Sequence, residues 1–419
     1  MSLLKRSSVY LLSNILNAIV PFLLLPILTN NLSPDEYGKI AMFQTLVSGL
    51  LALTGLNSVG SANRFFYDKN TSQSVSEYNG ACFHILFISS GALFIVFLMM
   101  HSLLSKLLHI PHDWLLWAIF VSSCTFIIQL RLGQWQIREE AFKYGLLQVS
   151  QSIFLFFVTL LLLFSFKQGA VSRINAMSIT GVLYVVISVS ALYREGLLSL
   201  TKVRLDYIKD ALMFGVPLIP HVIGIFLLSS IDRVLISDKL GVAAAGIYMV
   251  GVQLSLGMIV VFDAINKAFV PWLFRTLAEN HITKLNNLVR FTYLYFIVVF
   301  FLGILSFWVG PYVVKFIVGD EYLEATGLIG WLCLGQAFTG MYLMVTNYLF
   351  YKKRTGLLSL VTITCGILNI MLMVYAMEFY GLVGVSIAFA FSMCIRFIAT
   401  WLLALRVCGF SWLTPIMLK

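Results

Sequence analysis

Residues 13–68 read SNILNAIVPFLLLPILTNNLSPDEYGKIAMFQTLVSGLLALTGLNSVGSANRFFYD, and the rest of the chain repeats their plan. The stretch holds two apolar runs, each long enough to cross a bilayer, which takes about 20 largely apolar residues. A short polar turn at residues 30–39 joins the two runs, and the second run ends on a charged side chain, Arg64, followed by two phenylalanines. The pattern predicts two membrane-spanning helices joined by a short loop.

The composition of the whole chain excludes a soluble protein. Of the 419 residues, 60% are hydrophobic and 11% are charged, with a mean hydropathy of +0.93, whereas a soluble domain has about 25% charged residues. We therefore expect an all-α polytopic membrane protein and no nucleic-acid partner, despite the formal net charge of +10. The six cysteines lie in or at the ends of apolar runs, where they are expected to pack as small apolar residues.

Twelve apolar runs are long enough to span a membrane, which predicts twelve transmembrane helices. They are residues 10–28, 40–62, 81–104, 114–132, 142–166, 174–193, 211–233, 245–269, 289–308, 328–351, 357–377 and 382–405. Lys5 and Arg6 precede the first run as in a signal peptide. However, the run is too long and no A-x-A site follows it, so it is expected to stay as the first span. Trp308 and Trp331, near span ends, fit interfacial anchoring.

Lysine and arginine are divided unevenly between alternate loops. The side of the N-terminus holds 20 of these residues and the other side holds 7, while Arg396 lies inside the last run, which accounts for all 28. Acidic residues split evenly, 9 and 9. Because cytoplasmic loops carry the excess of basic residues, both termini are expected in the cytoplasm.

The longest interruption, residues 194–210, falls near the midpoint and suggests two lobes of six helices each, residues 1–208 and 209–419. Leu32 and Gly38 in the first turn match Leu240 and Gly246 in the corresponding turn of the second half, both shifted by 208 positions. With an even number of spans, both halves enter the membrane from the same side. We therefore expect lobes related by a pseudo-twofold axis along the membrane normal.

Prolines interrupt the first helix of each predicted half: Pro21 and Pro26, then Pro217 and Pro220. A proline removes a backbone hydrogen bond and lets a helix bend. A moving hinge and a static kink in a packed helix explain these prolines equally well.

Signatures of soluble enzymes are absent from the sequence. There is no G-x-x-x-x-G-K-[ST], H-E-x-x-H or G-x-S-x-G motif, so neither catalysis nor a cofactor is expected. His109 and His112 flank Pro111 without further clustered ligands, which favours interfacial histidines over a metal site. Without a nucleotide site, transport would depend on an ion gradient or run downhill.

Charges inside or at the ends of spans are the informative residues. A charge at the bilayer centre costs about 2.5–3.5 kcal/mol, so such residues face a cavity or a partner. The four on the predicted cytoplasmic side are Arg64, Arg131, Lys267 and Arg396. Asp263 and Lys267 share a helix face and are expected to pair, while Asp232 and Arg233 lie near the outer end of the seventh run.

Two explanations compete for these cations. Snorkelling, in which a long side chain reaches interfacial water, is preferred for Arg131, so Arg131→Ala is expected to be nearly silent. For Arg396 the two explanations are balanced. Arg64 and Lys267 lie at comparable ends of the second helix of each half, which favours a shared central cavity.

Three segments carry a resemblance to a known family. The opening S-N-I-L-N…L-P…L-S-P-D-E-Y-G-K, the run into S-A-N-R-F-F-Y and the segment D-R-V-L-I-S-D-K-L-G…A-G-I-Y-M-V resemble O-antigen flippases. These are the polysaccharide-transport branch of the multidrug/oligosaccharidyl-lipid/polysaccharide exporter superfamily. The resemblance covers nearly the whole chain in length, number of spans and repeat, and its motifs are specific to the branch, not to the sugar.

The resemblance implies a bilobed twelve-helix transporter of a bacterial inner membrane. Its substrate would be undecaprenyl diphosphate carrying an oligosaccharide repeat unit, moved from the cytoplasmic to the periplasmic leaflet for O-antigen or capsule assembly. Cationic cavity residues of the family correspond here to Arg64, Arg233 and Lys267. The implied partners are membrane lipids, a polysaccharide polymerase, a chain-length regulator and a coupling cation, H+ or Na+.

Three alternatives are weighed against this interpretation. A multidrug/cation antiporter of the same superfamily would have a more acidic cavity, whereas basic residues dominate the span ends here. A membrane polymerase or glycosyltransferase would present a sizeable loop of catalytic residues, whereas the outer loops are short. A structural membrane protein would not explain the repeat or the placed charges.

Overall fold

The computed structural model describes residues 3–67, 72–279, 281–352, 354–408 and 412, and every long element in that part is a helix. The helices are α1 (Leu3–Asn31), α2 (Pro34–Leu50), α3 (Ser58–Phe65), α4 (Ser72–Met99), α5 (His101–Leu108), α6 (His112–Ile137), α7 (Ala141–Phe164), α8 (Val171–Arg194), α9 (Leu205–Gly215), α10 (Ile219–Ser229), α11 (Ile231–Leu240), α12 (Val242–Glu279), α13 (Ile282–Ile317), α14 (Thr326–Tyr351) and α15 (Thr355–Cys408). Short 3-10 turns lie at Thr54–Asn57, Val216–Leu218 and Asp320–Ala325.

The prediction of an all-helical polytopic membrane protein is confirmed. In the described residues, 10 helices are long and apolar enough to cross a membrane, or 11 if the bent pair formed by α2 and residues 54–65 is one span. Helix α15 runs over 54 residues, but Gly381, with φ 55° and ψ −134°, breaks it into two helices. The number of twelve spans stays a prediction.

The second span begins earlier than the hydropathy of the sequence suggests. Helix α2 starts at Pro34, six residues before the expected start at residue 40, so the polar turn shrinks to Leu32 and Ser33. The Ser33 hydroxyl accepts a hydrogen bond from the Glu36 backbone at 3.3 Å, and the Glu36 carboxylate accepts one from the Ser33 backbone at 3.1 Å. This capping box, with a proline at the first helical position, stabilises a polar first turn that hydropathy alone misses.

The second span is also broken in its middle, which the sequence analysis did not predict. Gly55, Leu56 and Asn57 have φ angles of 70°, 49° and 58°, and the helix axis bends by 51° there. The break is held by neighbouring helices: the Gly55 amide donates to the Ser89 hydroxyl of α4 at 2.9 Å. A side chain at Gly55 would collide with the Phe126 ring of α6, 2.1 Å from the added carbon. Helix α3 therefore continues the span at an angle to α2.

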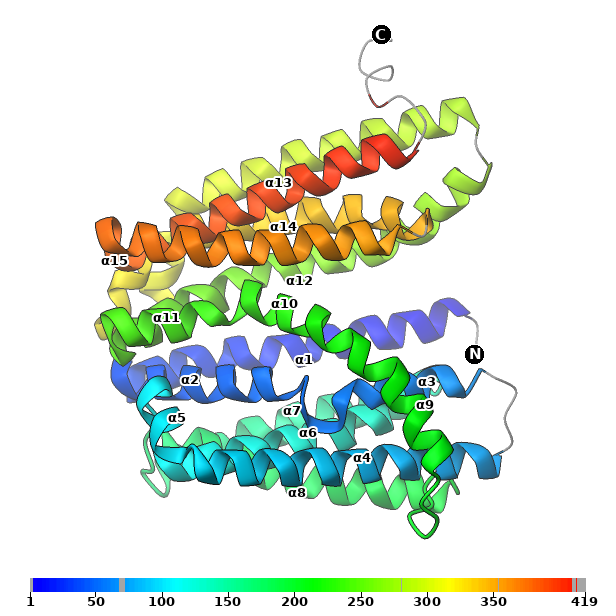
Figure 1. Cartoon of the computed structure of the whole chain (residues 1–419). Coiled ribbons are helices and arrows are strands. Elements are labelled where there is room, and N and C mark those ends of the chain that lie inside the picture. Colours follow the sequence, from blue (N-terminus) through cyan, green and yellow to red (C-terminus); the bar gives the residue numbers. More distant parts are fainter. Residues whose placement is uncertain (1–2, 68–71, 280, 353, 409–411, 413–419) are drawn as a thin grey trace. The chain divides into compact units, whose positions relative to one another are not determined.

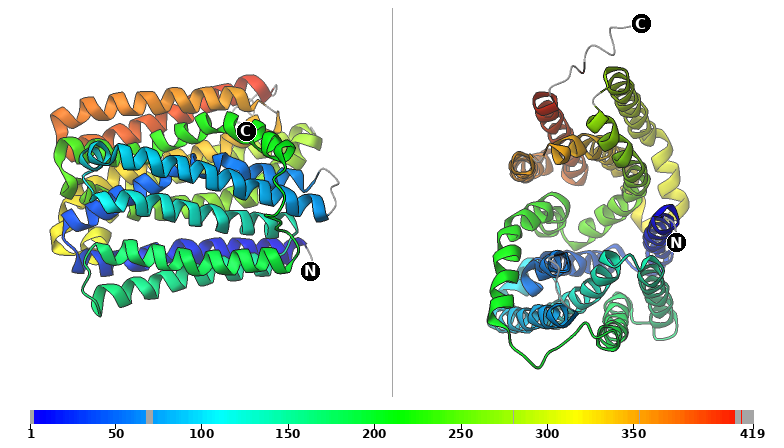
Figure 2. Two further views of the ribbon diagram at one scale, coloured as in Figure 1. Left: turned by 60° about the horizontal axis from the view of Figure 1, so that its bottom comes forward. Right: turned by 90° about the vertical axis from the view of Figure 1, so that its right-hand side faces the viewer.

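One compact unit of the chain comprises residues 1–226 and 236–246. Its helices α1, α2, α4, α6, α7 and α8 run side by side in Figure 1, and the right-hand view of Figure 2 looks along them. Buried side chains of α4, α6 and α8, including Tyr78, Phe83, Leu130 and Leu192, form a core between them. Helix α9 runs at a slant to the other helices of this unit (Figures 1 and 2).

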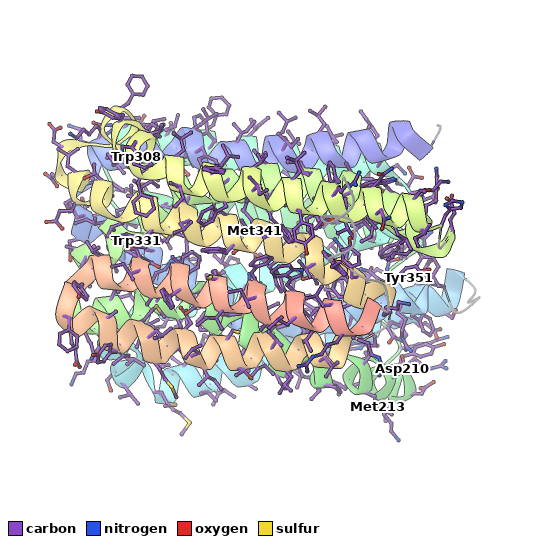
Figure 3. The ribbon with its side chains drawn as sticks, turned by 90° about the horizontal axis from the view of Figure 1, so that it is seen from above. Asp210, Met213, Trp308, Trp331, Met341 and Tyr351 are labelled. Carbon is purple, nitrogen blue, oxygen red and sulfur yellow. The ribbon has the colours of Figure 1, made fainter. Side chains whose placement is uncertain are left out.

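The second compact unit comprises residues 227–235 and 247–419. Its core is rich in aromatic rings from α13 and α15. The Phe397 ring stacks on Trp401 with 5.9 Å between ring centroids and packs edge-on against Phe296 with 5.0 Å between centroids. Trp308 and Trp331 lie at one end of this unit, opposite Tyr351 (Figure 3). That is the arrangement that interfacial anchoring requires. The pseudo-twofold relation between two lobes stays a prediction.

The mid-chain loop expected at residues 194–210 is shorter than predicted, because α9 already begins at Leu205. Asp206 in its first turn favours the helix by opposing the helix dipole. The Asn79 side chain donates to the Leu197 carbonyl at 2.8 Å, and the buried Glu77 carboxylate lies 3.2 Å from Arg204. The loop is thus fastened to the start of α4.

The four prolines occupy two kinds of position. Pro21 and Pro26 lie inside α1. Pro217 lies in the 3-10 turn that separates α9 from α10, and Pro220 is the second residue of α10. There, at a helix start, a missing N–H costs no intrahelical bond. Their role as hinges stays a prediction.

Candidate functional site

Arg64, in the last turn of α3, is the predicted cation with the most informative surroundings. Its guanidinium donates to the Asp210 carboxylate of α9 at 2.8 Å and lies over the Phe214 ring at 5.2 Å. The arginine side chain is 44% exposed and the aspartate 46%. Arg64 is therefore neutralised by a partner 146 residues away in sequence, yet keeps exposed surface.

The same carboxylate oxygen of Asp210 accepts a second hydrogen bond, from the Tyr78 hydroxyl of α4 at 2.7 Å. Tyr78 in turn stacks on Phe65 at 4.0 Å and lies 5.5 Å from the Tyr207 ring. Three helices, α3, α4 and α9, thus meet around one carboxylate. Sequence reasoning missed Asp210, because it is one of three acidic residues among four basic ones in residues 194–210 and nothing local connects it with Arg64.

The phenylalanines that follow Arg64 also have defined roles. Phe65 belongs to the stack on Tyr78, and the Phe66 ring lies 5.0 Å below the guanidinium of Arg138, the residue that follows α6. Burial lowers the pKa of Arg138. The R-F-F motif therefore fastens the end of α3 to both α4 and α6.

Arg131 of α6 lies in a different environment from the one predicted. Its side chain is 0% exposed, donates to the Glu195 carboxylate at 2.5 Å and lies 3.8 Å from the Trp135 ring. The Trp135 indole donates to the other carboxylate oxygen at 3.2 Å, and Lys143 lies 3.5 Å from it. The snorkelling interpretation of Arg131 is wrong, because its side chain has no exposed surface and its guanidinium ends on the Glu195 carboxylate and not in interfacial water.

Glu195, which directly follows α8, is the carboxylate of that pair. Partial burial opposes its ionisation, but the Arg131 guanidinium, the Trp135 indole and Lys143 outweigh burial and lower the pKa of the carboxyl. Helices α6, α7 and α8 are joined at this point. We therefore interpret Glu195 as a structural residue that holds the ends of these three helices together.

In the second unit, Lys267 and Asp263 of α12 form the ion pair that their spacing predicts, with 2.6 Å between the charged atoms. Both side chains are about half exposed. Arg396 of α15 lies over the Tyr342 ring of α14 at 4.1 Å, and its guanidinium is 3.4 Å from the Thr339 hydroxyl. Arg396 is thus directed at a neighbouring helix.

Asp232 and Arg233 lie in the first turn of α11, after the break that ends α10, and both are buried. The Arg233 guanidinium donates to the Ser229 carbonyl at 2.8 Å and contacts the Met249 sulfur at 3.2 Å. Its closest approach to the Asp232 carboxylate is 3.7 Å. The three predicted cations of this unit, Arg233, Lys267 and Arg396, therefore lie on three different helices, each with its own partners.

One face of α9 is largely apolar. Figure 3 labels Met213 and Asp210 on this helix; Met213 is 68% exposed. A shallow groove of about 530 Å³ runs along this face and is lined by Leu205, Leu212 and Met213, with Lys209 also on its wall. In the part of the chain that the structure describes, no group of three or more His, Cys, Asp or Glu side chains could hold a metal ion.

Comparisons with known proteins agree on the class of this fold. The sequence pattern of the family described as "Polysaccharide biosynthesis protein" matches residues 3–277. An uncharacterized membrane protein of Haemophilus influenzae is 30% identical over 379 residues, which cover 89% of each chain. The Lsg locus putative protein 1 of the same organism is 26% identical over 367 residues, covering 86% of this chain and 87% of that protein.

Solved structures share the fold at low identity. The lipid II flippase MurJ in an inward closed conformation has a TM-score of 0.75 at 15% identity, covering 99% of this chain and 96% of MurJ. An inward-facing multidrug resistance transporter of the MATE family, within the MOP superfamily, has a TM-score of 0.69 at 15% identity and 96% coverage of both chains. The chain is therefore a multi-pass membrane protein that belongs to the polysaccharide biosynthesis protein family and shares its fold with MurJ and the MATE transporter.

Proposed function

We propose that this protein is a flippase for lipid-linked oligosaccharides. It would move undecaprenyl-diphosphate-linked repeat units from the cytoplasmic to the periplasmic leaflet of a bacterial inner membrane, for O-antigen or capsule assembly. The observation that carries the proposal is Arg64, a half-exposed arginine at the end of a broken span. A guanidinium in that position suits a phosphate group, which it binds in a bidentate manner.

The family and the fold support the same function. The family is named for polysaccharide biosynthesis, and the fold matches that of a protein named as a lipid II flippase. A polysaccharide pathway needs a step that carries a lipid-linked intermediate across the membrane. In this proposal the protein moves the intermediate without making or breaking a bond.

The proposal includes the predicted topology. Counting the bent pair of α2 and residues 54–65 as one span and α15 as two, on either side of Gly381, would give twelve spans in the described residues. They would divide into lobes of residues 1–208 and 209–419, with both termini in the cytoplasm. Reporter fusions at Arg204 and Lys353 should then read cytoplasmic, and fusions at Glu36 and Glu321 periplasmic. A periplasmic result at Arg204 would refute the division into six plus six.

We assign the diphosphate to Arg64 and Lys267, with Arg233 and Arg396 as further cationic contacts. A cationic vestibule raises the local concentration of an anionic substrate. Alternating access would rock the two halves, with Pro21, Pro26, Pro217 and Pro220 as bending points. Asp232 and Asp263 would balance neighbouring cations or bind a coupling ion, H+ or Na+. A polymerase and a chain-length regulator would act on the exported unit.

A cation antiporter is the strongest rival, because a MATE transporter shares the fold. Such a transporter needs carboxylates that are free to bind cationic substrates. Here Asp263 is paired with Lys267 at 2.6 Å, and Asp232 lies 3.7 Å from Arg233. Both carboxylates thus lie beside a cation, and basic residues dominate the span ends, which favours an anionic substrate.

Deletion of the gene in its host tests the proposal. The expected result is loss of surface polysaccharide with lipid-linked repeat units accumulating on the cytoplasmic leaflet, restored by the wild-type chain and not by Arg64→Ala. Increased drug sensitivity with normal surface polysaccharide would identify an antiporter instead. Single repeat units reaching the outer leaflet without polymerisation would identify a polymerase. Translocation in proteoliposomes should respond to ionophores or run downhill, without ATP.

A further inference from the structure

Asp210 holds the guanidinium of Arg64 at the place where a substrate phosphate would bind. The contact is a charge-assisted hydrogen bond of 2.8 Å from the arginine to a carboxylate oxygen, which is the geometry that a phosphate oxygen would also adopt. The bond uses only the Nη2 donor of Arg64, so an anion that takes this donor must displace Asp210.

The pair is exposed enough for such an exchange. Both side chains are close to half exposed, so water and salt screen their attraction and pairing gains little. The Arg131–Glu195 pair of the same unit is the contrast, since that arginine has no exposed surface. An incoming anion can reach Arg64 but not Arg131.

Tyr78 gives Asp210 a second partner. Its hydroxyl donates to the same carboxylate oxygen at 2.7 Å, and the Tyr78 ring is buried against Phe65. When Arg64 turns to another anion, Asp210 keeps this hydrogen bond and is not left without a partner. The two donors share one carboxylate oxygen, which has a lone pair for each of them.

We propose that Asp210 is a displaceable internal counter-ion of the anion site: Arg64 pairs with Asp210 when the site is empty and with the substrate diphosphate when it is loaded, while Tyr78 retains Asp210. The inference rests on the proposed function and adds Asp210 and Tyr78 as positioning residues. An arginine that always has a partner avoids the cost of an isolated charge at the membrane. Return of Asp210 to Arg64 then helps to release the diphosphate.

The exchange is tested by binding of inorganic pyrophosphate to the full-length protein in nanodiscs at low salt, followed by 31P line broadening. Arg64→Ala should abolish binding, and Asp210→Asn should tighten it about two- to fivefold, because the competing charge of an exposed pair is gone. Tyr78→Phe should weaken binding about two- to threefold, and should have no effect when combined with Asp210→Asn. Asp206→Asn, a matched change on an exposed aspartate of the same helix that pairs with Arg204 at 3.1 Å, should leave binding unchanged.

The outcomes separate the inference from the proposed function. If Asp210 only orients Arg64, Asp210→Asn and Asp210→Ala will both weaken binding, which overturns the exchange while leaving anion capture at Arg64 intact. Unchanged binding in both Asp210 variants also overturns it. If Arg64→Ala binds pyrophosphate like the wild type, both the site and the exchange are wrong. Thermal melting of each variant confirms that it is folded.

Discussion

Two arginines on the neighbouring helices α3 and α6 pair with acidic residues in opposite ways. Arg64 meets Asp210 in a pair that is close to half exposed on both sides, beside the Phe214 ring. Arg131 meets Glu195 with its own side chain fully buried against Trp135. An arginine–carboxylate pair thus allows partner exchange at Arg64 and holds helices together at Arg131. The exposed fraction of the arginine side chain distinguishes the two cases.

Truncating the buried arginine should have the largest effect. Arg131→Ala leaves a cavity beside Trp135 and removes a charged hydrogen-bond donor from Glu195, whose side chain is 32% exposed, which should cost about 1.5–3 kcal/mol of stability. Unfolding in a graded denaturant, monitored by tryptophan fluorescence, measures this loss. The sequence-based expectation of a nearly silent substitution is replaced by its opposite. A melting curve unchanged from the wild type would show that the burial of Arg131 contributes nothing.

Truncating the exposed arginine should affect transport and not stability. Arg64→Ala should lower export of surface polysaccharide at least tenfold, while its stability changes by less than about 1 kcal/mol, because exposed pairs contribute little. Arg64→Lys keeps the charge without the bidentate fork and should retain partial export. Equal losses of stability at Arg64 and Arg131 would remove the distinction between the two pairs.

Lowering the pH should destabilise the fold at the Arg131–Glu195 pair. The folded pKa of Glu195 lies below the usual value of about 4.3, so its ionised form stabilises the folded state above that pH. This stabilisation is fully present at neutral pH and is lost as the pH falls through the folded pKa. Glu195→Gln should therefore flatten the acid dependence of stability at pH values below the ordinary glutamate pKa. The expected control is Glu140→Gln, an exposed neighbour with a longer 3.7 Å contact to Lys143, which should change little.

The smallest effect on stability is expected at the exposed pair of the second unit. Lys267→Ala breaks a contact within one helix between two half-exposed side chains and should change stability by about 0.5 kcal/mol or less. Export should nevertheless fall, since Lys267 is assigned to the diphosphate. Normal export by Lys267→Ala would show that Lys267 does not bind the diphosphate and would leave Arg64 as the cation assigned to it, in contrast to the structural Arg131.

Hydropathy predicted the membrane class and most helices, because long apolar runs have few alternatives in a bilayer. It failed at the second span, where the capping box at Ser33 and Glu36 extends a helix into polar sequence and Gly55 breaks it inside an apolar run. The cations themselves were found from sequence, as was the Asp263–Lys267 pair, because four-residue spacing on a helix places them together. The partners of Arg64 and Arg131 lie 146 and 64 residues away, and no local pattern connects them.

The break at Gly55 has a consequence for how the chain is made. A span interrupted by left-handed residues carries backbone groups that hydrocarbon cannot satisfy, so other protein segments must supply their partners. The Ser89 hydroxyl that meets the Gly55 amide is 34 residues further along, and the Phe126 ring that covers the glycine comes later still. A nascent chain that ended after the second span would therefore lack the side chains of Ser89 and Phe126 that contact the break at Gly55. We expect the second span to reach its final conformation only after α4 and α6 have entered the membrane.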